Sequence, residues 1–322
     1  MIIVIALSLL LAFAAALIPA GVHLGFRAPR LPETGTPADL GLAFVAARIP
    51  TLRQRQLFAW LLPVPGACQT VVVLHGWGSN AELMLPLAAP LQRAGMNVLL
   101  FDARNHGNSD SDSFSSLPRF AEDLGQAIDW LKRHHPHRAR RIAVLGHSVG
   151  AGAALFEASR NANISAVVSI AAFAHPAEVT ARYLRHLHIP AAITALVVRY
   201  VEWVIGHRFD SIAPINTVRR IACPILLVHG TDDHTVPLDD AHRIAAACSA
   251  PPIHVLEIPG ARHDSTEQIE QHVGALLRFL SQPSVFSLTL SHEILSEYSA
   301  PTPPDSSTAA TACRWRGSAL VG

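Results

Sequence analysis

Three kinds of polar side chain, far apart in the sequence, could together perform nucleophilic catalysis. Ser148 lies in the segment 146–150 (GHSVG), which fits the pattern G-x-S-x-G. An aspartate pair, Asp232 and Asp233, and a histidine, His263, follow further along the chain. A serine hydroxyl is a weak nucleophile until a base takes its proton, and that base needs an acid to orient it. Serine, aspartate and histidine in this order are the set that such chemistry requires.

The G-x-S-x-G pattern is short, so its meaning depends on the elements around it. The apolar run 141–145 (RIAVL) before it predicts a strand, and the alanine-rich run 151–160 after it predicts a helix. A serine at such a sharp strand–turn–helix corner is exposed at the edge of a sheet, and small neighbours let the turn close. We therefore interpret Ser148 as a nucleophile rather than as an incidental residue of a glycine-rich turn.

Predicted strands alternate with predicted helices along most of the chain. Apolar runs typical of strands covered on both faces lie at 70–75, 97–102, 141–146, 166–170, 224–229 and 254–258, after two leading strands at 42–48 and 56–62. This alternation predicts an α/β fold with a doubly wound, mostly parallel sheet. The carboxyl ends of parallel strands meet at one edge, so Ser148, the aspartate pair and His263 are expected to converge there.

One long segment interrupts the alternation. Residues from about 172 to 222 have helical character but no strand, which predicts a helical cap over the carboxyl edge of the sheet. Its apolar part, 188–209, carries Arg199 and Glu202 near the middle, which disfavours a second transmembrane helix. We interpret it as an amphipathic lid lining an acyl pocket, with a helix simply packed on the domain as the alternative.

The first 20 residues are almost entirely apolar. They contain one polar side chain, Ser8, and no charge, and about 20 apolar residues suffice to cross a bilayer core as a helix. The sequence thus predicts a transmembrane anchor at 1–22, a linker at 23–40, a catalytic domain at 41–282 and a disordered tail rich in Ser, Thr, Pro and Ala at 283–322. Arg27 and Arg30 follow the anchor, which favours a single-pass protein with a cytoplasmic catalytic domain. The alternative is secretion after signal-peptide cleavage, with an A-x-A site at 14–16.

The composition excludes several classes of function. Half of the residues are hydrophobic, 15% are charged and the net charge is +1, so neither global disorder nor an electrostatic field for nucleic acid is expected. The four cysteines show no CxxC spacing, and the histidines at 134, 135 and 137 have no flanking carboxylate or cysteine. We therefore predict neither a metal site nor an organic cofactor.

Four motifs in combination resemble those of the α/β-hydrolase superfamily, most of all the bacterial serine esterases and lipases with a helical cap. They are 75–80 (HGWGSN), 101–110 (FDARNHGNSD), 146–150 (GHSVG) and 229–237 (HGTDDHTVP), within a matched stretch from about 42 to 280. Asn105 departs from the pattern, because the family usually has a glycine there, and this affects the expectation for the local turn only. The resemblance implies the α/β-hydrolase fold, a serine catalytic triad and, for the anchor, a bacterial inner membrane.

The resemblance also implies roles for further residues. The family pattern H-G-x-x-D-x-x-V-P aligns its acid with Asp233, which leaves Asp232 as a turn residue. The oxyanion hole is then formed by the backbone N–H groups of Val149, directly after the nucleophile, and of Trp77 in the first motif. His75, Asp102 and His106 are assigned to loop architecture.

The expected activity is that of a serine hydrolase that cleaves carboxylic esters through an acyl-enzyme. A small-molecule or lipid ester is the expected substrate, because of the apolar N-terminus and cap, and the membrane is the expected partner through the N-terminal helix. A thioesterase or peptidase with the same triad is one alternative. A catalytically silent, membrane-tethered scaffold is the other.

Overall fold

The computed structural model describes residues 16–283, apart from the side chains of residues 266 and 267. One sheet holds eight strands in the order β1-β2-β4-β3-β5-β6-β7-β8. Their bounds are Val45–Thr51 (β1), Arg55–Leu62 (β2), Gln69–Leu74 (β3), Asn97–Phe101 (β4), Arg141–His147 (β5), Ile164–Ile170 (β6), Ile225–Gly230 (β7) and Ile253–Ile258 (β8). The pairs β1–β2 and β2–β4 are antiparallel, and all the others are parallel. The predicted mostly parallel sheet is confirmed.

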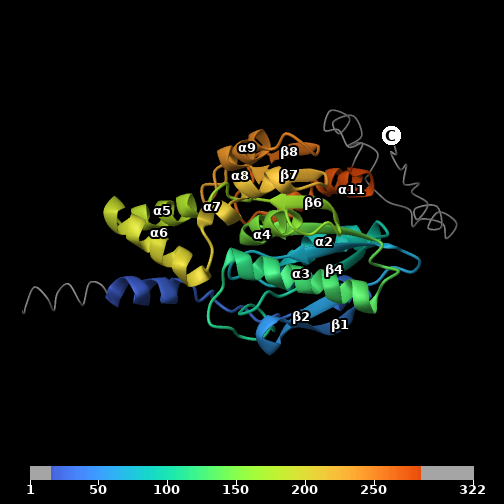
Figure 1. Ribbon diagram of the computed structural model, residues 1–322. Helices are drawn as coiled ribbons and strands as arrows, with labels where there is room; N and C mark the ends of the chain where they lie inside the picture. Colours follow the sequence, from blue (N-terminus) through green and yellow to red (C-terminus); the bar gives the residue numbers. More distant parts are fainter. Residues whose placement is uncertain (1–15, 284–322) are drawn as a thin grey trace, which may run out of the picture.

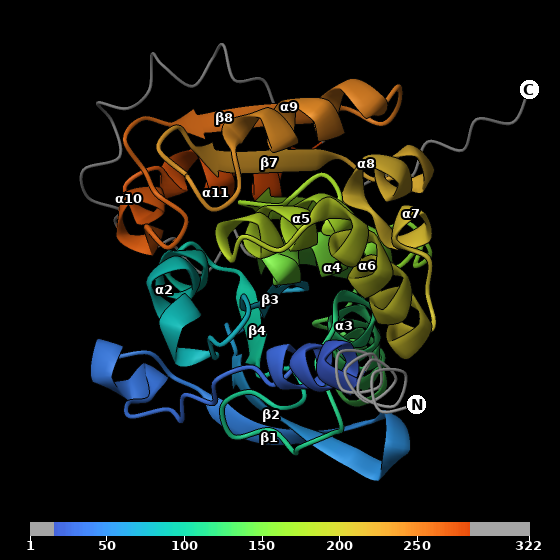
Figure 2. The same ribbon diagram turned by 90° about the vertical axis from the view of Figure 1, so that its left-hand side faces the viewer.

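Helices cover both faces of this sheet (Figures 1 and 2). The longer helices are Leu85–Arg93 (α2), Leu117–His134 (α3), Val149–Ala158 (α4), Pro176–His186 (α5), Ala191–Ile205 (α6), Leu238–Ala247 (α9) and Val273–Ser281 (α11). The short ones are Phe209–Ile212 (α7), Pro214–Thr217 (α8) and Thr266–Glu270 (α10), with 3-10 turns at Pro37–Leu40 (η1), Leu52–Gln54 (η2), Glu82–Met84 (η3) and Val218–Arg220 (η4). Helices α3, α4 and α9 contribute to one buried cluster, and α2, α10 and α11 to the other. Two clusters on opposite faces define a doubly wound sheet.

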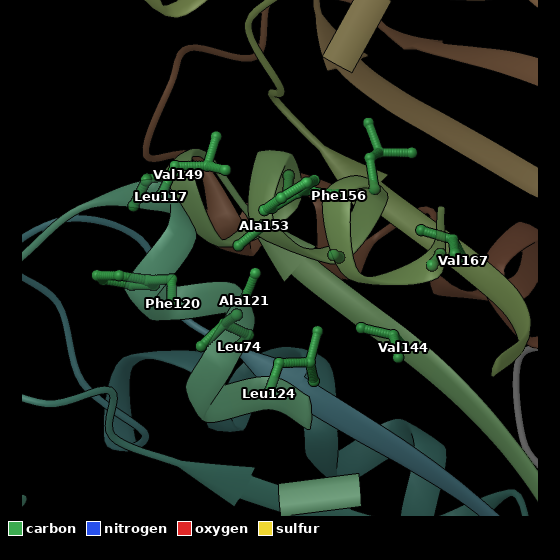
Figure 3. Packing of buried hydrophobic residues seen from close by; sticks show 14 of the residues in the cluster. Leu74, Leu117, Phe120, Ala121, Leu124, Val144, Val149, Ala153, Phe156 and Val167 are labelled. Atoms are coloured by element: carbon green, nitrogen blue, oxygen red, sulfur yellow. The ribbon is translucent and has the colours of Figure 1, made fainter. Parts of the chain in front are cut away.

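The central strands are apolar throughout because both of their faces are buried. In β5, Ile142 and Val144 belong to the cluster under α3 and α4, whereas Ala143 and Leu145 belong to the cluster on the other face. Figure 3 shows Val144 in the first cluster, together with side chains of α3 and α4 such as Leu124 and Phe156. This packing fixes α4 against β5, and the turn between them carries Ser148.

The segment predicted as a cap folds entirely as helices and turns. The chain leaves β6 and forms α5, α6, α7, α8 and η4 before it returns to the sheet at β7. Helices α5 and α6 stand out from one end of the molecule, beside a helix at residues 16–25 (Figures 1 and 2). Only Pro176 is buried in α5, and only Val201 and Glu202 are buried in α6.

The two ends of the chain fall largely outside the described residues. This applies to most of the predicted anchor (1–22) and to almost all of the predicted tail (283–322). Within residues 16–283, no helix has the length and apolar character needed to cross a membrane. Residues 16–25 are helical, and the predicted linker that follows packs on the domain, where Arg30 donates hydrogen bonds to the carbonyl oxygens of Gly107 and Ser109.

Candidate active site

Ser148 lies at a tight turn between β5 and α4, with φ 54° and ψ −119°. A positive φ is strained for a serine and persists only where its surroundings enforce it. The enforcing contacts involve two glycines. A Cβ atom on Gly146 would lie 2.4 Å from the carbonyl oxygen of Gly150, and one on Gly150 would lie 2.3 Å from that of His75. The turn therefore closes only with glycine on both sides of the serine.

The structure brings Ser148 together with His263 and Asp233. The Ser148 Oγ lies 2.9 Å from His263 Nε2, and His263 Nδ1 lies 2.7 Å from Asp233 Oδ2. Ser148 follows β5, Asp233 follows β7 and His263 follows β8, so all three lie at the carboxyl edge of the sheet. The arrangement permits a proton to pass from the serine hydroxyl to an imidazole that a carboxylate orients.

Asp233, and not its neighbour Asp232, faces the histidine. The Asp233 side chain is fully buried, and its Oδ1 accepts hydrogen bonds from the backbone N–H groups of Thr235 (2.9 Å) and Val236 (2.8 Å). Burial by itself raises the pKa of Asp233, but the hydrogen bonds from His229, His263 and Val236 outweigh it and hold the pKa below its ordinary value. Asp233 is thus a carboxylate throughout the neutral range, whereas Asp232 is exposed.

Two histidines complete the surroundings of this group, and neither was predicted as a site residue. His229 Nε2–H donates to the carbonyl oxygen of Val236 (2.8 Å) and lies 3.5 Å from Asp233 Oδ2. His147 Nε2–H donates to the backbone carbonyl oxygen of His263 (2.8 Å) and thereby ties the loop after β8 to the nucleophile turn. Burial lowers the pKa of His147, which keeps its ring neutral. Both residues lie inside recognised motifs, but their contacts depend on loops that the motifs do not define.

The two predicted oxyanion donors lie on segments next to Ser148. Val149 is the first residue of α4, and the first N–H groups of a helix have no partner within that helix. Trp77 lies in a turn in which the Ser79 N–H donates to the Gly76 carbonyl oxygen (3.3 Å). A Cβ atom on Gly76 would lie 3.3 Å from Ser148 Cβ, so this turn packs directly on the nucleophile. The Trp77 ring itself is 37% exposed.

His75 links the ends of two strands, in agreement with its assignment to loop architecture. Its Nδ1–H donates to the Gly76 carbonyl oxygen (2.7 Å), and its Nε2 accepts from the Ala103 N–H (3.0 Å). Burial, with the neighbouring His106, lowers the pKa of His75 to about 3. The turn that contains Asn105 also forms normally: Asn105 has φ 71°, in the left-handed region that asparagine tolerates better than most residues.

One group in the described part of the chain has donor atoms spaced closely enough to suggest a metal ligand set. His147, His263 and Asp264 each offer one donor atom, and the three atoms lie within 4.8 Å of one another. Both imidazoles already make the hydrogen bonds given above, to Ser148, Asp233 and the His263 carbonyl oxygen. These hydrogen bonds favour proton transfer as the use of the His263 ring and positioning of the His263 backbone as the use of the His147 ring, and we assign no metal to them.

Comparison with known proteins agrees with this fold. Residues 65–214 match the family described as serine aminopeptidase, S33. The solved structure of the Pyrococcus furiosus esterase Pf2001 superposes with a TM-score of 0.64 at 26% identity, over 79% of this chain and 96% of that one. Est1E from Butyrivibrio proteoclasticus with bound ferulic acid shares the fold, with a TM-score of 0.55 at 17% identity over 72% and 98% of the two chains.

The sequence relatives extend the comparison to further organisms. An uncharacterized protein of Mycobacterium tuberculosis is 28% identical over 71% of this chain and 76% of its own length. An α/β-hydrolase domain-containing protein 17B of Xenopus laevis is 22% identical over 69% of both chains. The chain therefore has the α/β-hydrolase fold that the four motifs predicted.

Proposed function

We propose that this protein is a serine hydrolase that cleaves carboxylic esters through an acyl-enzyme. The observation that carries the proposal is the continuous hydrogen-bonded chain from Ser148 Oγ through the His263 imidazole to the buried carboxylate of Asp233. This geometry combines a nucleophile, a base and an orienting acid with a constrained turn behind the serine. A passive scaffold would need none of these features.

The proposed reaction uses these groups in two half-reactions. The Ser148 Oγ attacks the ester carbonyl carbon while its proton passes to His263 Nε2, and Asp233 stabilises the imidazolium. The backbone N–H groups of Val149 and Trp77 donate to the oxyanion, and each such donor typically lowers the barrier by about 3 kcal/mol. The alcohol leaves with the proton from His263. Water, activated by the same imidazole, then releases the acid and restores the serine hydroxyl.

An ester with an apolar acyl group is the substrate class that we favour. The Pyrococcus furiosus protein, with 26% identity over most of both chains, is an esterase. The cap helix α6 is rich in apolar side chains and emerges from the same edge of the sheet as Ser148.

The family description supports a second candidate function. Residues 65–214 match a family described by a serine aminopeptidase, and the same triad would hydrolyse a peptide bond. A thioester is chemically closer to an ester and needs no change in the mechanism. The leaving group, rather than the triad, therefore separates the three possibilities.

A panel of substrates tests the proposal. The full chain in mild detergent is assayed with p-nitrophenyl esters of increasing acyl length, an acyl thioester and aminoacyl p-nitroanilides. We expect the esters to be cleaved fastest, and the Ser148→Ala variant to lose activity by at least about 10³-fold. Ser159→Ala, in the serine directly after α4, is the matched control and should retain activity. Fastest cleavage of an anilide would instead favour a peptidase, and no labelling by a fluorophosphonate would favour a silent scaffold.

We further propose that the apolar N-terminal segment holds the protein at a membrane, with the catalytic domain on the cytoplasmic side. The support for this is the sequence of residues 1–20 and the arginines that follow it. Resistance of the catalytic domain to protease in intact spheroplasts, and its digestion after lysis, is the expected result. Digestion in intact spheroplasts would contradict the orientation.

A further inference from the structure

The cap exposes a set of large apolar side chains. Two helices and the connection between them carry it, and we call it the cap surface. It consists of Tyr183 (66% exposed), Leu187 (54%), Ile193 (39%), Leu196 (60%) and Trp203 (75%). A helix on a globular domain normally exposes a polar face opposite its buried apolar stripe. Helix α6 packs such a stripe against the main buried cluster through Val201 and its neighbours, but its outer side is also apolar and exposes Leu196 and Trp203. An exposed patch of this kind marks an interaction site.

The helix at residues 16–25 extends the same surface. Its Val22 belongs to the main buried cluster, and the Nε2 of its His23 lies 3.2 Å from the hydroxyl oxygen of Tyr200 in α6. On its outer side, Leu17 is 54% exposed and Leu24 is 70% exposed. Both views show this helix, in blue, next to α6 at the protruding end of the molecule (Figures 1 and 2).

The exposed charged residues of α5 and α6 are positive, and the exposed Asp210 of α7 lies 2.9 Å from the His175 ring. The two acidic residues of segment 176–205 are both paired: Glu178 with Arg243 at 2.7 Å, and Glu202 with Arg208 at 3.3 Å. Arg185 and Arg199 lie on the same two helices and are exposed. Apolar side chains among exposed arginines are the pattern of a surface that lies in the headgroup region of an anionic bilayer.

The sequence before Ala16 identifies the occupant of this surface. Residues 1–15 are apolar except for Ser8, and the helix at 16–25 that follows them in the sequence lies beside α6 at the cap end of the molecule (Figure 1). A protein partner could cover the cap surface, but a lipid bilayer accommodates the cap surface and the apolar N-terminus together. We infer that the cap surface docks onto an anionic lipid bilayer, so that α5 and α6 lie in its headgroup region.

This contact, which builds on the proposed function, specifies the source of the substrate. The Ser148 N–H donates to the carbonyl oxygen of Ile170 at the end of β6 (2.8 Å), and α5 begins at Pro176, a short connection later. The cap therefore emerges directly beside the nucleophile. Docked as inferred, it brings esters of the bilayer to Ser148 without passage through water.

Tryptophan fluorescence tests the contact directly. The full chain is reconstituted in vesicles of phosphatidylcholine and phosphatidylglycerol, with and without brominated acyl chains. The emission of Trp203 is obtained by subtracting the emission of the Trp203→Phe variant from that of the unmodified protein. We expect brominated lipid to reduce that difference at least about twofold, as for a ring just below the headgroups, and aqueous iodide to leave it unchanged. Quenching of Trp203 by iodide would overturn the inference. Absence of quenching by both agents would also overturn it, and would indicate that a protein segment or a second copy covers the cap surface.

Enzyme kinetics test the consequence and separate it from the proposed function. In the double variant Leu196→Asp and Trp203→Asp, hydrolysis of a monoacyl ester embedded in these vesicles should fall at least about tenfold, the ratio that one large buried apolar side chain can supply. Hydrolysis of soluble p-nitrophenyl acetate should stay unchanged. Leu40→Asp is the control, because Leu40 is 43% exposed and lies on η1, outside the cap surface. Equal loss of activity on both substrates, or no loss on either, would overturn the inference. If the unmodified protein cleaves neither ester, the proposed function is contradicted, and the fluorescence experiment alone then tests the contact with the bilayer.

Discussion

The aspartate pair after β7 offers an internally controlled test of the proposed triad. Asp233→Asn keeps the shape of the side chain but removes the charge that orients and stabilises the imidazole, and in comparable triads this lowers kcat by about 10⁴-fold. Asp232→Asn alters an exposed carboxylate one residue away and should leave kcat within about twofold. Steady-state kinetics on one ester decide the matter. Similar losses in both variants would show that the assignment of the acid is wrong.

His147 should act as a positioning residue through the loop that carries His263. Loss of its hydrogen bond to the His263 carbonyl oxygen in His147→Phe frees that loop, and we expect kcat to fall about tenfold to 100-fold with little change in KM. His147→Gln keeps a donor and should recover part of the loss. A uniform fall in stability in both variants, without this difference in kcat, would indicate a role in packing only.

The buried His75 predicts how stability depends on pH. Its pKa is lowered to about 3, so the folded state binds a proton less readily than the unfolded state, whose histidine titrates near 6.5. Its contribution to the free energy of unfolding is therefore complete above about pH 6.5 and is lost as the pH falls toward 3. Urea unfolding at pH 7, 6, 5 and 4 should show a shallower decline for His75→Gln than for the unmodified protein, although the variant is less stable at pH 7. Parallel declines would contradict this account.

The sequence indicated which residues converge at the candidate site better than it indicated what supports them. The convergence of Ser148, Asp233 and His263 was predictable because each follows a predicted strand, and Ser148 and Asp233 also lie in recognisable motifs. The contacts of His147 and His229 were not, since both depend on the path of loops whose shape no periodicity describes. Asn105 is a further example of a loop that the motif does not define. It replaces the glycine that the motif usually has, and it still adopts the positive φ that the turn needs.

The turn between β5 and α4 depends on the close approach of two backbone segments. A Cβ atom in Gly150→Ala would lie 2.3 Å from the His75 carbonyl oxygen, and neither backbone segment can yield without moving Ser148. We expect a loss of about 2 kcal/mol or more in the free energy of unfolding, together with a large loss of activity. The control is Gly274→Ala in α11, where the nearest side-chain atom to a new Cβ belongs to Arg278 and lies 3.6 Å away, and the change should be neutral or stabilising. Urea denaturation measures the free energy of unfolding of both variants. An unchanged free energy of unfolding in Gly150→Ala would contradict this role of the turn.

Strand and helix positions followed from the sequence where burial is uniform. The central strands were predictable to within about two residues because both of their faces are apolar. Helices α9 and α10 were not assigned from the sequence: α10 is short, and α9 mixes buried Ala241 and Ile244 with charged residues that weaken its apolar periodicity. In the cap, composition indicated helices but not that α5 and α6 would bury so little of their apolar surface.

As a whole, the molecule gathers its candidate site and its exposed apolar surface at one edge of the sheet. The sheet gathers the nucleophile, base and acid at its carboxyl edge, and the cap and the helix at 16–25 extend from that same edge as an exposed apolar surface. Long-range features of this kind depend on the packing of elements distant in the chain, such as Tyr200 against His23, and no local pattern encodes them. The arrangement places the proposed site of ester cleavage next to the proposed source of lipid.

The most direct test of the central claim is the site of covalent labelling. The full chain is treated with a fluorophosphonate, digested and analysed by mass spectrometry, with His263→Ala and heat-unfolded protein as controls. The account predicts one phosphonylated residue, Ser148, with labelling abolished by unfolding and slowed at least about 10³-fold in His263→Ala. A folded protein that remains unlabelled, or that is labelled at a different serine, would contradict the assignment of Ser148 as an activated nucleophile.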